Sequence, residues 1–219
     1  SSTAYEVKFL AKFLAQQGYH VIANNLPGHG TTIDDCNRTK YSDWLSFTDA
    51  NFAKLVSESD KVYVIGCSMG SILGLYLASK FPINGLVLGG AHTQFKQWFS
   101  VNYLNPLFCH LLKKSKKHSK IKEIKFYGYS YYPLIALNQF KKLLNFMSLK
   151  YVEVVSPTLI IHGGKDNLAT YDNSEFIYNK ISSENKDIVT MNKAHHNLFD
   201  KNPNSEKIHS IVHKFIQKY

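Results

Sequence analysis

The feature that most constrains this chain is residues 66–70, which read GCSMG and lie between a predicted strand and a predicted helix. The strand covers residues 61–67 (KVYVIGC), and the helix covers residues 69–80 and ends before a proline. Glycine has no Cβ atom, so a chain that turns this sharply can hold Ser68 in a strained conformation with its hydroxyl clear of the sheet. A GxSxG pattern alone is often only a turn, but its flanking elements here predict a nucleophilic serine.

Other segments continue this alternation of strand and helix. Apolar runs of strand length occupy residues 19–26, 85–90, 158–163 and 187–191, and helical spacing occurs at residues 4–17, at residues 43–58 and after Pro203. The strands are apolar throughout rather than at alternate residues, which is typical of parallel strands covered by helices on both faces. We therefore predict an α/β fold with a mostly parallel sheet flanked by helices, whose core comprises residues 1–91 and 151–219.

Residues 92–150 interrupt the alternation with a lysine-rich, aromatic segment that we predict to be helical. Because this segment follows the carboxyl end of a strand, we interpret it as a cap, or lid insertion, over a pocket. Its rings could line an apolar acyl pocket, although each single ring could equally pack in a core. The rings concerned are Trp98, Phe99, Tyr103, Phe108 and the aromatic stretch near Tyr129.

A nucleophilic serine needs a histidine to remove its proton and a carboxylate to hold that histidine. Asp166 follows the predicted strand 158–163, and His195 and His196 follow the last predicted strand. All three would project from strand carboxyl ends at one edge of the sheet, where open α/β sheets bind ligands. The N–H of Met69, at the start of the helix after Ser68, would point to where a carbonyl oxygen gains negative charge.

Two of these assignments have competitors in the sequence. We favour His196 over His195, because Ala194 and His195 can then fill the small turn that precedes it. Asp166 competes with three acids that are more typical of helix ends or of the surface, namely Asp172, Glu175 and Asp187. We interpret the other histidines as surface or packing residues. No histidine pair with ligand spacing lies beside a carboxylate cluster, so we expect neither a metal nor a cofactor.

The formal net charge of +10 comes almost wholly from lysine, since Arg38 is the only arginine. Seven lysines lie between Lys113 and Lys125 with a single acid, Glu123. Nucleic-acid readers depend on the bidentate fork of arginine, so we expect no nucleic-acid partner. The lysines could attract an anionic membrane, but a solvated surface explains them as well, and we do not expect membrane contact.

Cysteine usage and hydropathy indicate the compartment. The three cysteines, Cys36, Cys67 and Cys109, have no CxxC spacing, which disfavours a disulfide framework and a thiolate zinc site. The sequence contains no uncharged apolar run of about 18 residues and no basic-then-apolar layout of a secretory signal. We therefore expect a cytoplasmic protein.

Together these motifs resemble the serine hydrolases of the α/β-hydrolase superfamily, and most of all the small bacterial carboxylesterases and monoacylglycerol lipases. The resemblance covers most of the chain outside the cap and includes NNLPGHG (24–30), Trp44, GCSMG (66–70), PTLIIHGGKD (157–166), IYNK (177–180) and AHHNL (194–198). It implies the α/β-hydrolase fold, with Ser68 as nucleophile, Asp166 as acid and the Met69 N–H as an oxyanion donor. The spacing from Ile177 in those esterases favours His196 as the base.

One departure from that pattern concerns the beginning of the chain. The enzymes it resembles have, just before the first helix seen here, a central strand ending in a His-Gly-aromatic segment that supplies a second oxyanion N–H. The only HG pairs here, at residues 29–30 and 162–163, belong to other loops. Loss of one oxyanion donor typically costs about 10²- to 10³-fold in rate. We therefore expect either that N-terminal strands of the natural protein are missing from this sequence or that the chain is a poorly active remnant.

The function that we expect is hydrolysis of a small-molecule carboxylic ester through an acyl-enzyme, without a cofactor. The aromatic cap favours short or medium acyl chains or monoacylglycerols. A thioesterase or a serine peptidase of the same fold would share these residues. From other classes, the chain could be a truncated, non-catalytic binding protein or a lysine-driven binder of membranes or nucleic acid.

Overall fold

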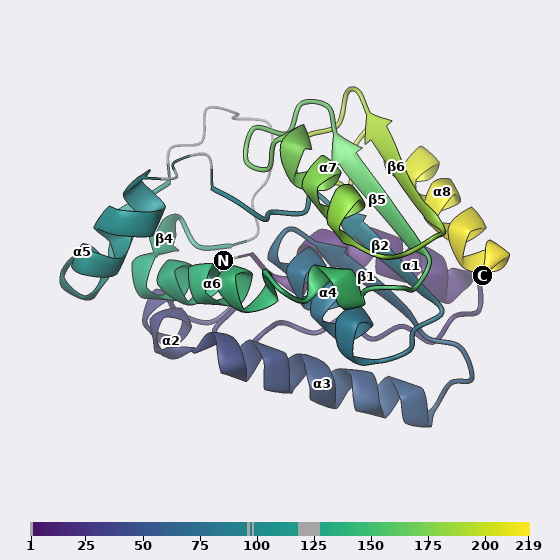
Figure 1. The fold of residues 1–219 in the computed structure, drawn as a ribbon, viewed down its shortest axis with the longest axis horizontal. Helices are drawn as coiled ribbons and strands as arrows, with labels where there is room; N and C mark the ends of the chain where they lie inside the picture. The colour runs from purple at the N-terminus through teal and green to yellow at the C-terminus, as the bar shows by residue number, and fades with distance from the viewer. Residues whose placement is uncertain (1, 96, 98, 118–127) are drawn as a thin grey trace.

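The computed structural model describes residues 2–95, 97, 99–117 and 128–219. In this part of the chain four parallel strands form one sheet, in the order β1 (Tyr63–Cys67), β2 (Gly85–Gly89), β5 (Thr158–Gly163) and β6 (Lys186–Met191), as Figure 1 shows. The register places Val87 between Ile65 and Leu159. The predicted parallel sheet is therefore confirmed, and four of the five predicted strands form it.

Burial explains why the central strands are apolar almost throughout. Every residue of β2 and β5 is buried. Leu86 and Leu88 join the core cluster on one face of the sheet, whereas Val87 joins the cluster on the other face. A strand that is covered on both faces needs apolar side chains at successive positions, so its sequence loses the alternation of a half-exposed strand.

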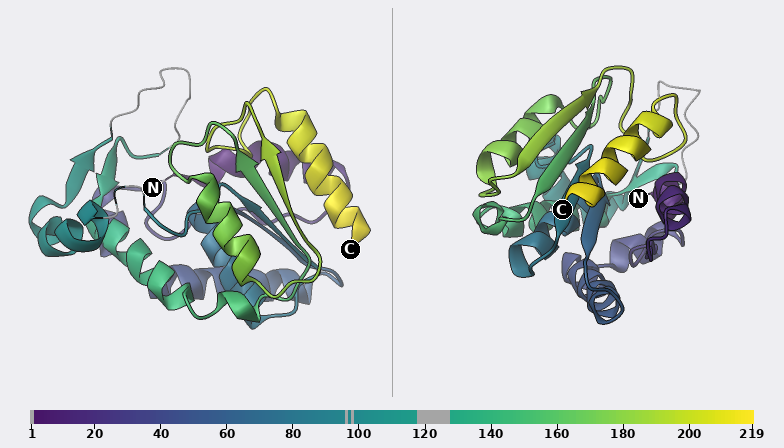
Figure 2. Two further views of the ribbon diagram at one scale, coloured as in Figure 1. Left: turned by 45° about the horizontal axis from the view of Figure 1, so that its top comes forward. Right: turned by 90° about the vertical axis from the view of Figure 1, so that its right-hand side faces the viewer.

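Helices cover both faces of the sheet (Figure 2). On one face lie α3 (Tyr41–Ser57), α4 (Met69–Lys80) and α7 (Tyr171–Lys180), and on the other lie α1 (Lys8–Gln16) and α8 (Ser205–Lys218). The shorter elements are η1 (Ala4–Val7), α2 (Ile33–Arg38) and η3 (Tyr151–Glu153). Within the described ranges, no helix has both the length and the apolar character needed to cross a membrane.

The prediction of a buried strand at residues 19–26 is wrong. These residues make no strand pairing, and none of them is fully buried. A strand forms only where a neighbour bonds its N–H and C=O groups, and in the described residues β1 pairs with β2 alone. The apolar side chains of Tyr19 and Val21 instead pack against the core cluster of α1 and α8.

The described part of the cap, residues 92–150, is mostly helical, as predicted, but it also contains a small sheet. Its elements are η2 (Ser100–Leu104), α5 (Asn105–Leu112), β3 (Lys114–Lys116), β4 (Tyr131–Pro133) and α6 (Leu134–Met147). The antiparallel pair β3–β4 was not expected, because the sequence KSK of β3 is fully exposed and has no apolar pattern to predict a strand.

Polar side chains attach the cap to the loop and helix that follow residue 26. The side-chain oxygen of Asn37 accepts hydrogen bonds from the first-turn N–H groups of Ile135 and Ala136 in α6, and its amide nitrogen donates to Lys113 O. The hydroxyl of Tyr129 donates to Gly28 O at 2.7 Å. These contacts fix the cap beside the carboxyl ends of the strands.

Candidate active site

Ser68 occupies a strained turn between β1 and α4. Its φ of 55° and ψ of −117° lie outside the regions that L-residues usually adopt. Two backbone bonds hold this conformation: Ser68 N–H donates to Gly89 O at 2.9 Å, and Ser68 O accepts from Ser71 N–H at 3.0 Å. The turn predicted from GCSMG is therefore present.

The turn closes so tightly that Gly66 cannot carry a side chain. A Cβ atom at Gly66 would collide with the carbonyl oxygen of Gly70 and would lie 2.7 Å from the Cα of Ser71. The Ser71 hydroxyl, which is buried, also donates to Gly66 O at 3.0 Å. By contrast, a Cβ atom at Gly70 would meet nothing within 4 Å. The turn therefore requires the absence of a side chain at Gly66 but not at Gly70.

This difference predicts opposite effects of two alanine substitutions. We expect Gly66→Ala to lower the free energy of unfolding by more than about 2 kcal/mol, because backbone atoms must move to accept the methyl group. Gly70→Ala, in the first turn of α4, should leave stability unchanged or raise it by about 0.5–1 kcal/mol. Chemical denaturation measures both, and equal stabilities of the two variants would refute this account of the turn.

The structure brings Ser68, His196 and Asp166 together in one hydrogen-bonded chain. His196 Nε2 lies 3.0 Å from Ser68 Oγ, and His196 Nδ1 lies 2.7 Å from Asp166 Oδ2. The other carboxylate oxygen of Asp166 accepts the backbone N–H groups of Leu168 and Ala169, both at 2.9 Å. The imidazole therefore faces the hydroxyl with one nitrogen while the carboxylate holds the other.

The surroundings of Asp166 keep it ionised. Its side chain is fully buried, and burial by itself raises the pKa of a carboxyl group. The hydrogen bond and charge of His196, together with the N–H groups of Ala169 and Leu168, outweigh burial and lower the pKa of Asp166 below its ordinary value. An ionised Asp166 favours the tautomer of His196 that leaves Nε2 free to accept a proton.

The competing residues lie elsewhere. His195 Nδ1 lies 3.2 Å from Lys165 O instead of facing Ser68. Asp172, Glu175 and Asp187 are exposed, on α7 and β6. Close backbone packing fixes the loop of the two histidines, since a Cβ atom at Gly163 would lie 2.5 Å from His195 O and one at Gly90 would lie 3.2 Å from His196 Nδ1.

Met69 is the first residue of α4 and directly follows Ser68. The N–H groups of a helix's first turn have no partner within the helix, and they carry the positive end of its dipole. The position of Met69 is thus the one expected for an oxyanion donor, and its role stays a prediction.

Three rings proposed for the acyl pocket lie on the surface. Phe99, Tyr103 and Phe108 are exposed, so the core interpretation is wrong for them, and the pocket interpretation stays a prediction. Helical geometry explains their exposure. The face of η2 and α5 that packs inward carries Val101 and Cys109, so the rings lie on the other faces. Tyr129 bonds the loop at Gly28, and Trp98 lies outside the described residues.

His92 is a residue near the site that the sequence did not single out. It follows β2, and its ring packs against Phe95 and Phe140 at centroid distances of 4.9 and 6.0 Å. Burial, followed by the charge of His196, lowers the pKa of His92 to about 4. Its only sequence signal is its place after a strand carboxyl end. A neutral imidazole beside the active-site histidine adds no competing charge.

Buried histidines make stability depend on pH. Burial is also the main cause that lowers the pKa of His29, from 6.5 to about 4. The unfolded chain therefore binds more protons between pH 6.5 and 4, and the free energy of unfolding should fall as the pH drops through this window. We expect on the order of 3 kcal/mol for each histidine, measured by urea denaturation. His92→Phe should flatten the profile, and an unchanged slope would contradict the assignment.

Nothing in the described part of the chain resembles a metal centre: no three His, Cys, Asp or Glu side chains gather as ligands would. The arrangement that is present is a hydroxyl, an imidazole and a carboxylate in line, and such an arrangement is chemically able to transfer a proton away from the hydroxyl.

Comparison with known proteins agrees with this fold. A family model described as the alpha/beta hydrolase fold matches residues 1–108, and a model described as serine aminopeptidase, S33, matches residues 131–203. The chain has the α/β-hydrolase fold. These matches confirm the fold expected from the strand–GCSMG–helix unit.

Among its relatives are small bacterial lipolytic enzymes. The chain is 28% identical over 200 residues to a thermostable monoacylglycerol lipase of Bacillus sp. (strain H-257), covering 90% of this chain and 79% of the lipase. It is 23% identical over 217 residues to a carboxylesterase of Bacillus subtilis (strain 168), covering 97% of this chain and 87% of the esterase.

Solved structures share the fold. A metagenome-derived lipolytic enzyme superposes with a TM-score of 0.89 at 24% identity, covering all of this chain and 90% of the enzyme. The monoacylglycerol lipase of Paleococcus ferrophilus superposes with a TM-score of 0.79 at 15% identity, covering all of this chain and 91% of the lipase.

Proposed function

We propose that this chain hydrolyses carboxylic esters through an acyl-enzyme formed on Ser68. The observation that carries the proposal is the hydrogen-bonded series of Ser68, His196 and Asp166, with distances of 3.0 and 2.7 Å, at a strained serine. Two of its relatives, named as a monoacylglycerol lipase and a carboxylesterase, support the same reaction class.

The geometry divides the reaction between three side chains. Ser68 Oγ attacks the ester carbonyl while His196 Nε2 accepts its proton, and the negative charge on the carbonyl oxygen develops next to the Met69 N–H. His196 then returns the proton to the departing alcohol, which leaves an acyl group on Ser68. Water then attacks this acyl group while His196 accepts its proton, and His196 passes that proton to Ser68 Oγ as the bond to the acyl group breaks and the acid leaves. Asp166 holds the imidazole and stabilises its protonated form throughout.

For the substrate we propose esters with short or medium acyl chains, monoacylglycerols included. The support is the name of the Bacillus lipase and of the Paleococcus structure. Hydrolysis rates for p-nitrophenyl esters of increasing chain length and for monoacylglycerols test this proposal. A rate maximum at acetate that falls steadily with chain length would exclude monoacylglycerols as the preferred substrate.

A peptidase is the second candidate, because the model that matches residues 131–203 is described as a serine aminopeptidase. A thioesterase also remains an alternative of the same fold. Matched substrates with one acyl group as ester, thioester and p-nitroanilide distinguish the three reactions. We expect kcat/KM for the ester to exceed that for the anilide by about 100-fold or more. A preference for the anilide of an amino acid would favour the peptidase, and no turnover by the folded chain would favour a binding protein.

A further inference from the structure

The net positive charge of this protein comes from one segment of the chain. Residues 92–150 contain eleven lysines and one acidic residue, Glu123, which gives this segment a formal charge of +10. The rest of the chain contains fifteen basic and fifteen acidic residues and is formally neutral. The whole net charge of +10 therefore belongs to the cap, and a codon bias towards lysine would not concentrate it there.

The same segment has an exposed apolar helix face. Val101, Asn105 and Cys109, spaced by four residues, are buried, and α5 packs against α6. The rest of the surface of η2 and α5 carries large apolar side chains that are 42–77% exposed: Phe99, Tyr103, Leu104, Leu107, Phe108, Leu111 and Leu112. We call these seven residues the outer cap face. So many large exposed apolar side chains on adjacent turns mark an interaction surface.

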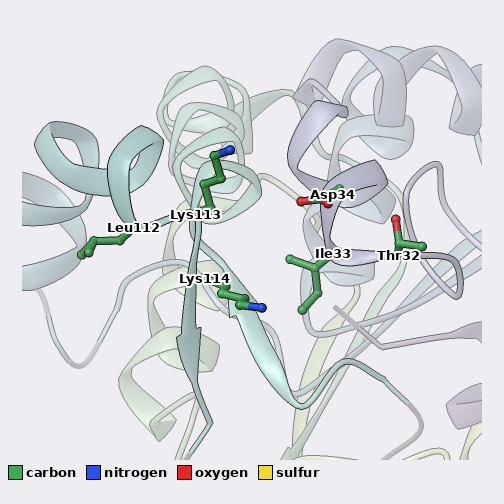
Figure 3. Close-up of a pocket in the computed structure, with 6 residues that line it drawn as sticks. All are labelled: Thr32, Ile33, Asp34, Leu112, Lys113 and Lys114. Atoms are coloured by element: carbon green, nitrogen blue, oxygen red, sulfur yellow. The ribbon is translucent and has the colours of Figure 1, made fainter.

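In the sequence, the outer cap face is followed directly by exposed lysines. Lys113, Lys114 and Lys116 come directly after Leu112, and all three are exposed. An open pocket of about 400 Å³ lies between this stretch and the start of α2. Figure 3 shows that the side chains of Lys113 and Lys114 extend toward the α2 side of the pocket, whereas Leu112 points the other way. Asp34 contributes the single carboxylate among the pocket residues.

The position of this surface leaves it accessible. In Figures 1 and 2, α5 lies at one end of the molecule and α8 at the opposite end. No residue of the outer cap face belongs to either of the two core clusters. A partner can therefore reach α5 without disturbing the sheet or the helices that cover it.

Apolar side chains beside lysines, in a segment with almost no acids, match the surface of an anionic bilayer. Leucine and phenylalanine enter the boundary between headgroups and acyl chains, and lysines pair with headgroup phosphates while their stems lie along the apolar surface. An apolar protein partner would match the leucines but would not explain why the cap carries all of the net charge.

We propose that the outer cap face, with Lys113, Lys114 and Lys116, docks this protein on the surface of an anionic phospholipid bilayer. Contact is peripheral, through side chains on one helix face. This surface does not depend on the ester hydrolase activity, because none of its residues lies in the series of Ser68, His196 and Asp166. It revises the expectation that the lysine-rich cap has no membrane contact.

The test is co-sedimentation of the full chain, carrying Ser68→Ala so that no lipid is hydrolysed, with vesicles of stated composition. The vesicles are phosphatidylcholine alone or phosphatidylcholine mixed with phosphatidylglycerol. We expect binding to the mixed vesicles to be at least about tenfold tighter, and to weaken as salt is raised. Equal binding to both vesicle types, or none to either, would overturn the proposal.

A pair of charge-introducing variants assigns the surface. Leu107→Asp with Leu111→Asp should reduce binding at least about tenfold, and because these side chains are 73% and 77% exposed the thermal midpoint should stay near that of the parent. Leu149→Asp with Val155→Asp adds the same charge at side chains that are 84% and 69% exposed and should reduce binding far less. Equal losses in both pairs would overturn the assignment. A dimer that forms without vesicles, and that only the first pair of substitutions dissociates, would also overturn the assignment. The outer cap face would then bind a second copy of this chain.

Discussion

Replacement of Ser68 by alanine is expected to reduce kcat/KM for ester substrates on the order of 10⁴- to 10⁶-fold. The Ser68 hydroxyl lies 3.0 Å from His196 Nε2, and alanine removes both this nucleophile and the proton that the imidazole would accept. Activity that remains would come from water attacking an ester bound beside the Met69 N–H.

Loss of activity has to be separated from loss of fold. The φ of 55° at Ser68 strains alanine as much as serine, so Ser68→Ala should unfold at nearly the same temperature as the parent. Ser57→Ala is a suitable control, because this exposed residue lies at the end of α3, where its hydroxyl donates to Lys54 O. This control should keep full activity. An active Ser68→Ala variant would remove the proposed mechanism altogether.

The second large effect concerns Asp166. We expect Asp166→Asn to lower kcat about 10⁴-fold while the fold persists. An asparagine side chain can occupy the same space, but its NH₂ group can donate to His196 Nδ1 and so favours the tautomer with the proton on Nε2. In that tautomer the nitrogen 3.0 Å from Ser68 Oγ can no longer accept a proton.

The sequence itself provides the matched controls for this substitution. Asp172→Asn and Asp187→Asn remove acids in α7 and in β6 that competed with Asp166 in the sequence, and both residues are exposed. Steady-state kinetics should show less than about a twofold change in kcat for each control. A loss in Asp187→Asn comparable to that in Asp166→Asn would mean that the acid has been assigned to the wrong strand.

The sequence predicted the parts of the fold in which local pattern and burial agree. Residues 85–90 and 158–163 are apolar almost throughout because both faces of β2 and β5 are buried, so strand type and parallel pairing could be inferred together. The site residues could also be predicted from the sequence. GCSMG requires a tight turn, and the chain order serine, acid, histidine places Asp166 and His196 after later strands.

Where prediction was wrong, the missing information was long-range. Residues 19–26 have a strand-like composition, yet pairing depends on a neighbour that the local sequence does not reveal. The rings of η2 and α5 show helical spacing, but only the packing of α5 on α6 decides that Cys109 turns inward and Phe108 outward. The preference for His196 over His195, by contrast, agrees with the structure, in which His196 Nε2 lies against Ser68 Oγ and His195 Nδ1 lies against Lys165 O.

The most direct test of the central claim is to locate the adduct of a fluorophosphonate by peptide mass spectrometry. Fluorophosphonates react with a serine only where a neighbouring base activates it. We predict one adduct per chain, on the peptide that contains Ser68, and its loss in Ser68→Ala together with a large reduction in rate in Asp166→Asn. Labelling at another residue, or no labelling of the folded chain, would contradict the claim that His196 activates Ser68.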